Sequence, residues 1–320
     1  MKNQPLVSVI VPIYGVEAYI AQCAESLMAQ TYPAIEYIFV NDGTKDRSME
    51  VLAGVLERFP EKNVQIVNQE NKGLPQARAA GVRVAKGEFI AHVDSDDWVE
   101  PDLVERVVEK AVSTGADFVY YDFWKVHSGY RKLDREKHYE TADKELYMRR
   151  LYSYLAYGYV WNKFARKSLY QHLFFPKYNM HEDIVIATQL LYRAQHIEQL
   201  SVPLVHYRRN NPASVMHEAK KKRRVQSANN MLDMYEYYRE NLAGSPVEPV
   251  LNDLILRTAW VAYTLDKNLY TERPYLKEMA RRLPLMPGRR VNLIQQLILR
   301  LYLITSMAKV SRSTGGPALK

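Results

Sequence analysis

Five short runs of apolar residues, many of them β-branched or aromatic, recur along the first 125 residues of the chain. They occupy residues 7–11, 37–40, 64–67, 89–93 and 118–121. Within each run the apolar residues are largely continuous and do not alternate with polar ones, which is typical of strands covered on both faces in a parallel sheet. The pattern therefore predicts five strands of one sheet.

Segments long enough to form helices separate these runs. They span residues 18–30, 48–59, 75–85 and 101–113. Pro75 and Pro101 stand where the first turn of a helix tolerates proline, and Asp46 is a candidate N-cap. Strands that alternate with helices in this way predict an open α/β sheet with right-handed crossover connections.

Polar residues follow the predicted strands, at the edge where open α/β sheets bind ligands outside the carboxyl ends of their strands. Pro12, Tyr14 and Glu17 follow the first strand. Later strands are followed by the polar segments 41–44, 68–73 and 94–97. In such a sheet these residues meet at one edge.

The second half of the chain has a less regular pattern. From residue 130 to about 212 it is rich in tyrosine and includes Trp161-Asn162-Lys163 and His181-Glu182-Asp183. Residues 216–320 look helical and open with five consecutive basic residues at 220–224.

The net charge of the chain is concentrated at its C-terminal end. The 320 residues include 44 Lys and Arg and 36 Asp and Glu, which gives a net charge of +8. Residues 281–320 contain eight basic residues and no acidic one, so the rest of the chain is neutral. Hydrophobic residues make up 47% and charged residues 25% of the chain, which excludes a wholly disordered or fibrous protein.

Cys23 is the single cysteine of the sequence. It excludes an internal disulfide and a thiolate metal cluster, and it fits a reducing compartment. The sequence shows neither the ~18 uninterrupted apolar residues of a membrane span nor the pattern of a signal peptide. We therefore expect a protein that is neither secreted nor membrane-spanning.

Asp94 and Asp96 follow directly on the fourth apolar run. In extended backbone, residues i and i+2 point to one face, so the two carboxylates repel each other unless a cation lies beside them. Carboxylate oxygens suit Mg²⁺ or Mn²⁺, which also bind phosphate oxygens. A solvated acidic turn is the alternative, but the position at the predicted ligand edge favours a cation site.

Other candidate residues are ambiguous when each is taken alone. Asp42 could simply stabilise its own turn. Lys72 and Gly73 could present an ammonium and a backbone N–H to a diphosphate, or form an ordinary turn. Arg78, one turn into the following helix, could make a surface salt bridge.

Two further candidates lie in the second half of the chain. Asp183 precedes an apolar helical pattern and therefore lies at a helix N-terminus, where a carboxylate stays ionised. It could act as a general base or be a plain N-cap. His206 follows a short apolar run and is either a metal ligand or a core histidine.

Together these segments resemble glycosyltransferase family 2, the inverting nucleotide-sugar transferases of the GT-A fold. The resemblance is close over residues 6–125 and looser over 150–215, with the order and spacing of bacterial polysaccharide and lipopolysaccharide glycosyltransferases. It is carried by VSVIVPIYGVEAYI (7–20), SLMAQTYPAIEYIFVNDGTKDRS (26–48), QENKGLPQARAAGVRVAKGEFIAHVDSDDWVEPD (69–102), WNKFARKSL (161–169), HEDIVIATQLLYRA (181–194) and HYRRNNPASV (206–215).

The resemblance implies an α/β chain with a Rossmann-like GT-A sheet and a C-terminal helical extension. The catalytic domain would cover residues 1–215, with a donor half to about residue 125 and an acceptor half over about 126–215. Residues 216–320 would form the helical region with its basic, amphipathic tail.

The resemblance also implies roles for individual residues. Asp183 would be the catalytic base, and Asp96 would bind a divalent metal, with His206 as a further possible ligand. Asp42 would accept a hydrogen bond from a uracil-type N–H. The nucleotide-sugar would be bound by Pro12, Tyr14, Glu17, Asp42, Lys72, Gly73, Arg78, Asp94, Ser95 and Asp96, and the acceptor by Trp98, Trp161, Asn162 and Glu182.

The sequence departs from the family pattern at two positions. Asn41 replaces the first acid of the pair before Gly43, and Ala79 replaces the usual Asn after the Ala-Arg pair. The Trp motif of processive members is not visible, which favours the addition of a single sugar. One base without an enzyme nucleophile implies a single displacement with inversion.

Two other functions compete with this interpretation. A sugar-phosphate nucleotidylyltransferase would normally carry a Gly-rich basic loop after the first strand, which this sequence lacks. The C-terminal tail could instead make this a non-catalytic protein that binds nucleic acid or membranes. Residues 220–224 favour nucleic acid, although a solvated helix face or a membrane-facing patch fits them better. We expect no nucleic-acid partner.

The C-terminal tail predicts attachment to a membrane. On a helix over residues 291–310, the apolar side chains Leu293, Ile294, Leu297, Leu301, Ile304 and Ala308 share one side. Together with the basic flanks, this pattern is typical of a helix that lies in an anionic leaflet, although packing on the catalytic domain is the alternative. We expect a cytoplasmic enzyme on the inner face of the cell membrane, acting on a glycan or lipid-linked acceptor.

Overall fold

The computed structural model describes residues 4–135, 147, 151, 157–211 and 219–238. The chain divides into two compact units, residues 1–217 and 218–320, and each is described by itself. The second unit is represented by one helix, α7 (Lys220–Tyr238). The expected amphipathic helix over 291–310 lies outside the described residues.

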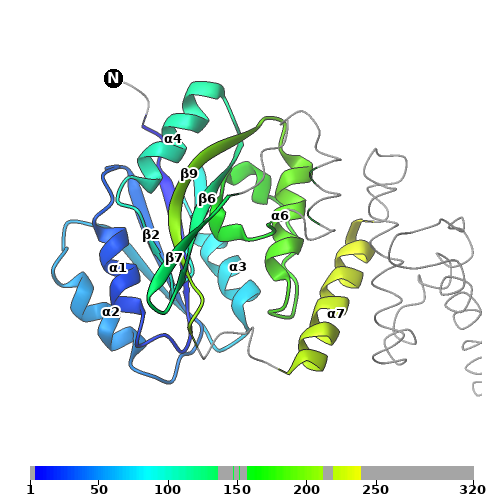
Figure 1. Cartoon of the computed structure of the whole chain (residues 1–320), viewed down its shortest axis with the longest axis horizontal. Coiled ribbons are helices and arrows are strands. Elements are labelled where there is room, and N and C mark those ends of the chain that lie inside the picture. The colour runs from blue at the N-terminus through cyan, green and yellow to red at the C-terminus, as the bar shows by residue number, and fades with distance from the viewer. Residues whose placement is uncertain (1–3, 136–146, 148–150, 152–156, 212–218, 239–320) are drawn as a thin grey trace, which may run out of the picture. The chain divides into compact units, whose positions relative to one another are not determined.

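A mixed sheet forms the centre of the first unit (Figure 1). Its order is β3-β2-β1-β4-β8-β6-β9-β5, and β7 pairs with β6. The strands are β1 (Val7–Ile13), β2 (Ile35–Asn41), β3 (Asn63–Asn68), β4 (Phe89–His92), β5 (Trp98–Val99), β6 (Phe118–His127), β7 (Tyr130–Asp134), β8 (Lys163–Arg166) and β9 (Ile197–Arg208).

Helices cover both faces of this sheet. They are α1 (Ile20–Met28), α2 (Ser48–Leu56), α3 (Leu74–Val84), α4 (Leu103–Thr114) and α6 (Glu182–Arg193), with short 3₁₀ helices at Val160–Asn162 and Lys167–Tyr170. Helices α1, α2 and α4 share a hydrophobic core with alternate β1 side chains such as Val9 and Val11. On the opposite face α3 packs closely, and a Cβ on its Gly81 would lie 2.4 Å from Ile10 Cγ2.

The predicted strands and helices of the first 125 residues are confirmed. Strands β3, β2, β1 and β4 are parallel, and Pro75 lies in the first turn of α3. Asp46 lies one residue before the N-cap of α2, yet its carboxylate accepts a hydrogen bond from Ser48 N at 3.2 Å.

The sheet differs from the expectation in two respects. It is not wholly parallel, because β8 runs antiparallel to β4 and β6. The expectation that every strand is covered on both faces is also wrong for β3, an edge strand whose Ile66 is 43% exposed. The apolar residues of β3 therefore marked a strand, but did not indicate how deeply it is buried.

The helical character expected of residues 216–320 is confirmed for the described part, α7. Among the described residues, no helix combines the length and the apolar composition that crossing a bilayer requires.

Candidate active site

The candidate site lies beyond the carboxyl end of β4, where the loop 94–97 meets the first turn of α6 and the side of α3. The loop begins with a turn closed by a hydrogen bond from Asp97 N to Asp94 O at 3.0 Å. Asp94 follows β4 closely, and Asp183 lies in the first turn of α6. The structure thus brings together the acids that the sequence placed at the ligand edge and at a helix N-terminus.

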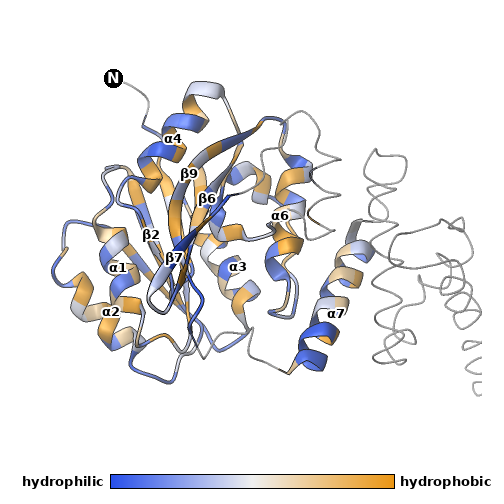
Figure 2. Cartoon of the chain, in the orientation of Figure 1, coloured by the Kyte–Doolittle hydropathy of each residue, from blue (hydrophilic) through white to orange (hydrophobic). Residues whose placement is uncertain are grey.

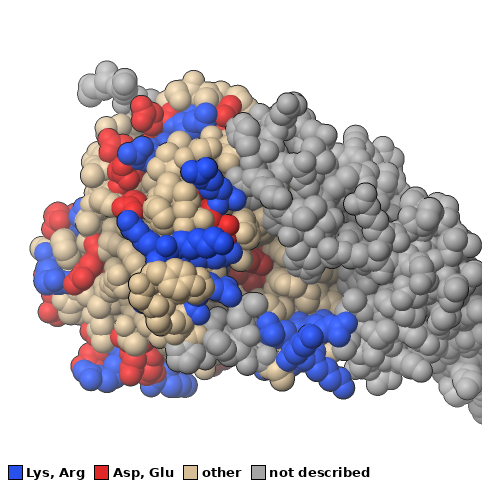
Figure 3. All heavy atoms as spheres, viewed as in Figure 1, with Lys and Arg blue, Asp and Glu red and all other residues tan. Residues whose placement is uncertain are grey.

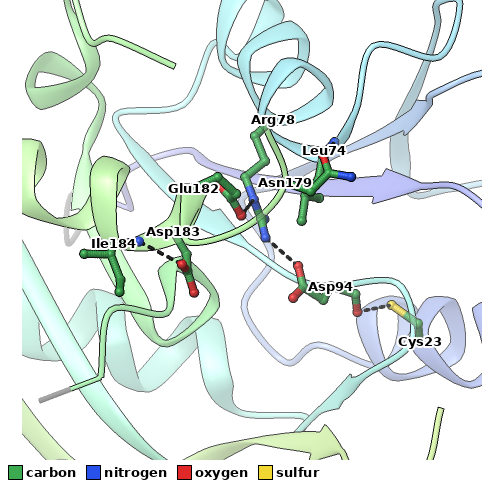
Figure 4. Close-up of polar contacts among 8 residues, drawn as sticks. All are labelled: Cys23, Leu74, Arg78, Asp94, Asn179, Glu182, Asp183 and Ile184. Atoms are coloured by element: carbon green, nitrogen blue, oxygen red, sulfur yellow. Dashed lines mark hydrogen bonds and ion pairs between the residues drawn. The ribbon is translucent and has the colours of Figure 1, made fainter. Parts of the chain in front are cut away.

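Arg78 connects these two acidic segments (Figure 4). Its Nη2 is 2.7 Å from Asp94 Oδ1, and its Nε is 3.1 Å from Glu182 Oε1. The side chain is 1% exposed, so the alternative of a surface salt bridge is wrong. A contact between Arg78 and a nucleotide-sugar remains a prediction.

Burial raises the pKa of both acids at the start of α6. For Asp183 it outweighs the hydrogen bond from Ile184 N at 2.8 Å and the charge of Arg78, and the pKa reaches about 6. For Glu182 it outweighs the charge of Arg78, and the pKa reaches about 8. The charge of Asp183 also raises the pKa of Glu182, so the two protons are lost in separate steps. Asp183 is consequently more basic than a solvated aspartate and still titrates below neutral pH.

The remaining acids of the 94–97 loop are crowded. Asp96 Oδ2 accepts a hydrogen bond from Asn211 Nδ2 at 2.7 Å. Its pKa is raised first by burial and then by the charge of Asp94. Burial, followed by the charges of Asp96 and Asp94, raises the pKa of Asp97 well above its usual value. Such like-charge repulsion is what a bound cation would relieve.

Arg208 holds this loop in place, a role that the sequence analysis missed. Its backbone N donates to Asp97 Oδ1 at 2.7 Å, and its Nε donates to the carbonyl oxygen of Asp96 at 2.8 Å. The guanidinium lies 4.8 Å from the ring centroids of both Tyr19 and Trp98. The segment HYRRNNPASV contained the residue, but nothing in it indicated a contact more than 100 positions away.

His206 is a buried residue of β9 that pairs with Trp98 of β5. Its ring stacks on that of Trp98 with centroids 4.8 Å apart, and its Nε2 is 2.8 Å from Glu100 Oε1. Burial lowers its pKa. Within the described residues there is no group of three His, Cys, Asp or Glu that could hold a metal. Metal binding by His206 therefore remains a prediction.

Asp42 organises the loop before α3. Its Oδ1 accepts hydrogen bonds from Gln69 Nε2 at 2.7 Å and Lys72 N at 2.9 Å, and its Oδ2 accepts one from Gly73 N at 2.9 Å. Asp42 therefore does stabilise neighbouring turns, as the alternative interpretation held. Its contact with a nucleobase remains a prediction.

The other expected donor residues are spread over several elements. Pro12 is buried within β1, and Ser95 is buried in the acidic loop. Tyr14 is 54% exposed. Glu17 accepts a hydrogen bond from Arg47 N at 2.9 Å, which ties it to the start of α2. Their roles in donor binding remain predictions.

The expected acceptor residues are largely buried. Trp161 is 3% exposed. Asn162 Nδ2 donates to Tyr121 O at 3.0 Å, and Lys163 Nζ donates to Asn162 Oδ1 at 2.6 Å. These bonds support the backbone of the acceptor half. The partly exposed rings beside them belong to Tyr157 and Tyr159, which the sequence analysis did not select.

The order and direction of the strands, with helices on both faces of the sheet, give this chain the GT-A fold. Staphylococcus aureus TarS residues 1–349, solved in complex with UDP-GlcNAc, superpose with a TM-score of 0.68 at 19% identity, over 96% of this chain and 92% of that chain. A mannosyltransferase, PcManGT from Pyrobaculum calidifontis, solved with GDP-Man and Mn²⁺, gives a TM-score of 0.55 at 18% identity, over 98% of this chain and 89% of that one. At these identities the likeness shows the fold alone.

The family follows from the sequence comparison. Residues 8–174 match the family model described as glycosyl transferase family 2, and the chain belongs to that family. Among curated relatives, EpsH and EpsJ of Bacillus subtilis (strain 168), both named glycosyltransferases, are 34% and 32% identical over 212 and 214 residues. Each match covers 64% of this chain, 61% of EpsH and 62% of EpsJ. The predicted family and fold class are thereby confirmed.

Proposed function

We propose that this chain transfers a single sugar from a nucleotide-sugar, most simply a UDP-sugar, to a hydroxyl of a glycan or lipid-linked acceptor in the synthesis of a bacterial surface polysaccharide. The observation that carries the proposal is the partly buried carboxylate of Asp183 at the start of α6, next in sequence to Glu182, which Arg78 joins to Asp94. A base and a donor-binding acid that lie close enough to affect each other's charge state suit a single displacement with inversion.

Nucleotide-sugar donors are supported by the structural neighbours. TarS was solved with UDP-GlcNAc and with UDP, and PcManGT with GDP-Man. The loop organised by Asp42 presents Lys72 and Gly73 at the same edge of the sheet as Asp94. We propose that this edge binds the nucleoside diphosphate, with Lys72 near its charge.

The acidic loop fits a divalent cation, Mn²⁺ or Mg²⁺. Asp94 and Asp96 are close enough for the charge of one to raise the pKa of the other, and carboxylates of this kind hold such ions together with substrate phosphates. Asp96 would be the direct ligand, with Asp94 beside it and His206 as a further candidate. When bound, the cation would neutralise the negative charge of the departing diphosphate.

The residues of the chain would perform the other steps. Asp183 would accept the proton of the acceptor hydroxyl as oxygen forms its bond to the anomeric carbon and the bond to the diphosphate breaks. The raised pKa of Asp183, about 6, makes it a better proton acceptor than a solvated aspartate while leaving it mostly ionised at pH 7. Arg208 would keep the acidic loop in position through its contacts with Asp96 and Asp97.

A donor screen tests the proposal. The purified chain is incubated with Mn²⁺ and a panel of nucleotide-sugars, and nucleotide release is measured with and without EDTA. We expect release from a restricted set of donors, loss of activity in EDTA, and a loss of about 3 kcal/mol or more of transition-state stabilisation in Asp96→Ala. Glu61→Ala, an exposed acid before β3, serves as the control. Full activity in EDTA would overturn the role of the metal.

We also propose that residues 281–320 attach the enzyme to an anionic membrane. The proposal rests on eight basic residues without an acidic one in this segment, since each basic residue near an anionic surface adds about 1 kcal/mol of attraction. The full chain should sediment with anionic liposomes at low salt. Deletion of residues 281–320 should abolish this sedimentation, while transfer to a soluble acceptor should continue. A full-length chain that ignores the liposomes would contradict the proposal.

A further inference from the structure

A hydrophilic hairpin extends the sheet beside the candidate site. Strand β7 pairs antiparallel with the end of β6, so that Lys132 lies opposite Lys125 and Tyr130 opposite His127. Figure 2 shows β7 as hydrophilic against the apolar strands of the sheet centre. On the face of the molecule that carries β7, Figure 3 shows Lys and Arg gathered in a band, with acidic atoms set back in a hollow beside it.

An aromatic wall connects this hairpin with the catalytic carboxylates. It consists of Tyr157, Tyr159, Trp161 and Tyr207. The rings of Tyr157 and Tyr159 stack at 5.3 Å, those of Tyr159 and Trp161 stack at 4.7 Å, and Tyr207 lies 5.7 Å from Tyr159. Phe123 of β6 meets the wall edge-on.

The wall reaches the reaction centre at one end. A Cβ on Gly158, between Tyr157 and Tyr159, would lie 2.4 Å from Cγ1 of Ile184, the residue after Asp183. Tyr207 directly precedes Arg208, whose N donates to Asp97 Oδ1 at 2.7 Å. The rings of Tyr157, Tyr159 and Tyr207 are only partly buried. The faces of Tyr159 are covered by Tyr157 and Trp161, so the exposed part of the wall offers ring edges and hydroxyls to a ligand whose reacting end lies at Asp183.

Cations accompany the rings at the other end. The guanidinium of Arg209 lies 5.3 Å from the ring centroid of Tyr207, and Arg209 Nη1 donates to the Tyr207 hydroxyl at 3.1 Å. Lys125 Nζ lies 5.0 Å from the ring of Tyr157 and forms an ion pair with Asp134. Lys132 and Arg209 are exposed, and neither has an acidic partner among the described residues.

Aromatic rings beside Lys132 and Arg209, exposed cations without an acidic partner among the described residues, indicate the chemical class of the ligand. A sugar ring has an apolar face that packs on an aromatic ring, and a cation beside the same ring suits an anion carried by the same sugar. A hexuronate has both features within one residue. Lys125 is already paired with Asp134, so Lys132, directly opposite it, is the lysine of this strand pair that is left for an anionic ligand.

We propose that the hairpin and the aromatic wall form the docking surface for the acceptor, and that this acceptor is an acidic glycan whose charge comes from uronic acid carboxylates. The proposal rests on the proposed transferase function, since it assigns the acceptor of the same site. The glycan would lie along the wall, its reacting hydroxyl at Asp183 and its carboxylates near Arg209 and Lys132.

Calorimetry on the full chain with trigalacturonic acid tests this assignment. Its methyl ester has the same backbone without the charges. We expect the acid to bind with a salt-dependent affinity at least about tenfold above that of the ester. Lys132→Gln combined with Arg209→Gln should remove most of this difference. The matched control is Arg83→Gln with Lys86→Gln, two exposed cations at the opposite end of β4, and it should bind like the unmodified chain.

Several outcomes would overturn the proposal. One is equal affinity for trigalacturonic acid and its methyl ester. Another is unchanged binding of the acid by the Lys132→Gln, Arg209→Gln variant. A third is tighter binding of a phosphorylated oligosaccharide, of RNA or of anionic vesicles that depends on the same two cations. UDP binding is measured on the same samples. If UDP fails to bind while trigalacturonate binds as expected, the transferase function is wrong and the glycan surface stands; the reverse result removes only the acceptor assignment.

Discussion

Replacing Arg78 with Gln removes the cation that joins the acidic loop after β4 to the acidic start of α6. Arg78 and Glu182 are 1% and 3% exposed, and Asp94 is 23% exposed. Removing one partner of a buried ion pair costs about 3–5 kcal/mol, because a charge is left without compensation. Water reaches Asp94 in part, so we expect the lower end of this range, about 3 kcal/mol.

Thermal unfolding measures this loss. In a domain of roughly 200 residues, 1 kcal/mol changes Tm by about 2–4 °C, so Arg78→Gln should lower Tm by about 6–12 °C. Arg78→Lys keeps the charge but not the forked geometry of the guanidinium. Its Tm should lie between those of Arg78→Gln and the unmodified chain. Arg83→Gln removes an exposed cation from the same helix and should leave Tm within about 1–2 °C of the unmodified chain.

The same variant should change the pH dependence of the reaction. The charge of Arg78 lowers the pKa of both Glu182 and Asp183 against the effect of burial. Without it both pKa values rise, and the acid limb of kcat/KM should move to higher pH. An unchanged Tm together with weakened donor binding would refute the reasoning, because Arg78 would then act as a donor contact and not as a buried bridge.

Three further predictions follow from single side chains. In the unmodified chain the acid limb of kcat/KM should lie near pH 6, since Asp183 must be ionised and its pKa is raised to about 6; a limb near pH 4 in a pH–rate profile would contradict this. Gly73→Ala should cost about 1–3 kcal/mol in denaturant unfolding, because φ is +87° and a Cβ would lie 2.6 Å from Asn179 Oδ1; unchanged stability would show that the loop relaxes freely. His92→Phe should stabilise the fold by about 1 kcal/mol, because neither ring nitrogen has a partner among the described residues; a lower Tm would count against this.

The donor half of the fold was predictable because its signals are local. Each parallel strand is a short apolar run, and each helix begins with recognisable residues such as Pro75. Strands β5 and β7 were not predicted, because one has two residues and the other is mostly polar. The parallel pairing of β6 with β9 joins residues almost 80 positions apart, which no local pattern records.

The site was predictable as a set of residues, but not as a network. The structure brings Asp94, Asp96 and Asp183 close together, although the sequence placed only the first two at the edge of the sheet, and their roles remain predictions. The burial of Arg78 could not be predicted, because its partner Glu182 lies 104 positions away in the sequence. Arg208 was missed for the same reason, since its hydrogen bonds to Asp96 and Asp97 depend on the path of β9. Residue types indicate the chemistry, whereas burial and distant partners set the charge state.

The identity of the catalytic base is the central claim, and Asp183→Asn tests it most directly. The substitution keeps the shape of the side chain and its acceptor for Ile184 N, but removes the basic oxygen. Donor affinity is measured by calorimetry and turnover by nucleotide release in the presence of acceptor. Near-normal donor affinity with turnover reduced by roughly 10²–10⁴-fold is the expected result. Collapse of donor binding, or turnover that survives the substitution, would contradict the account.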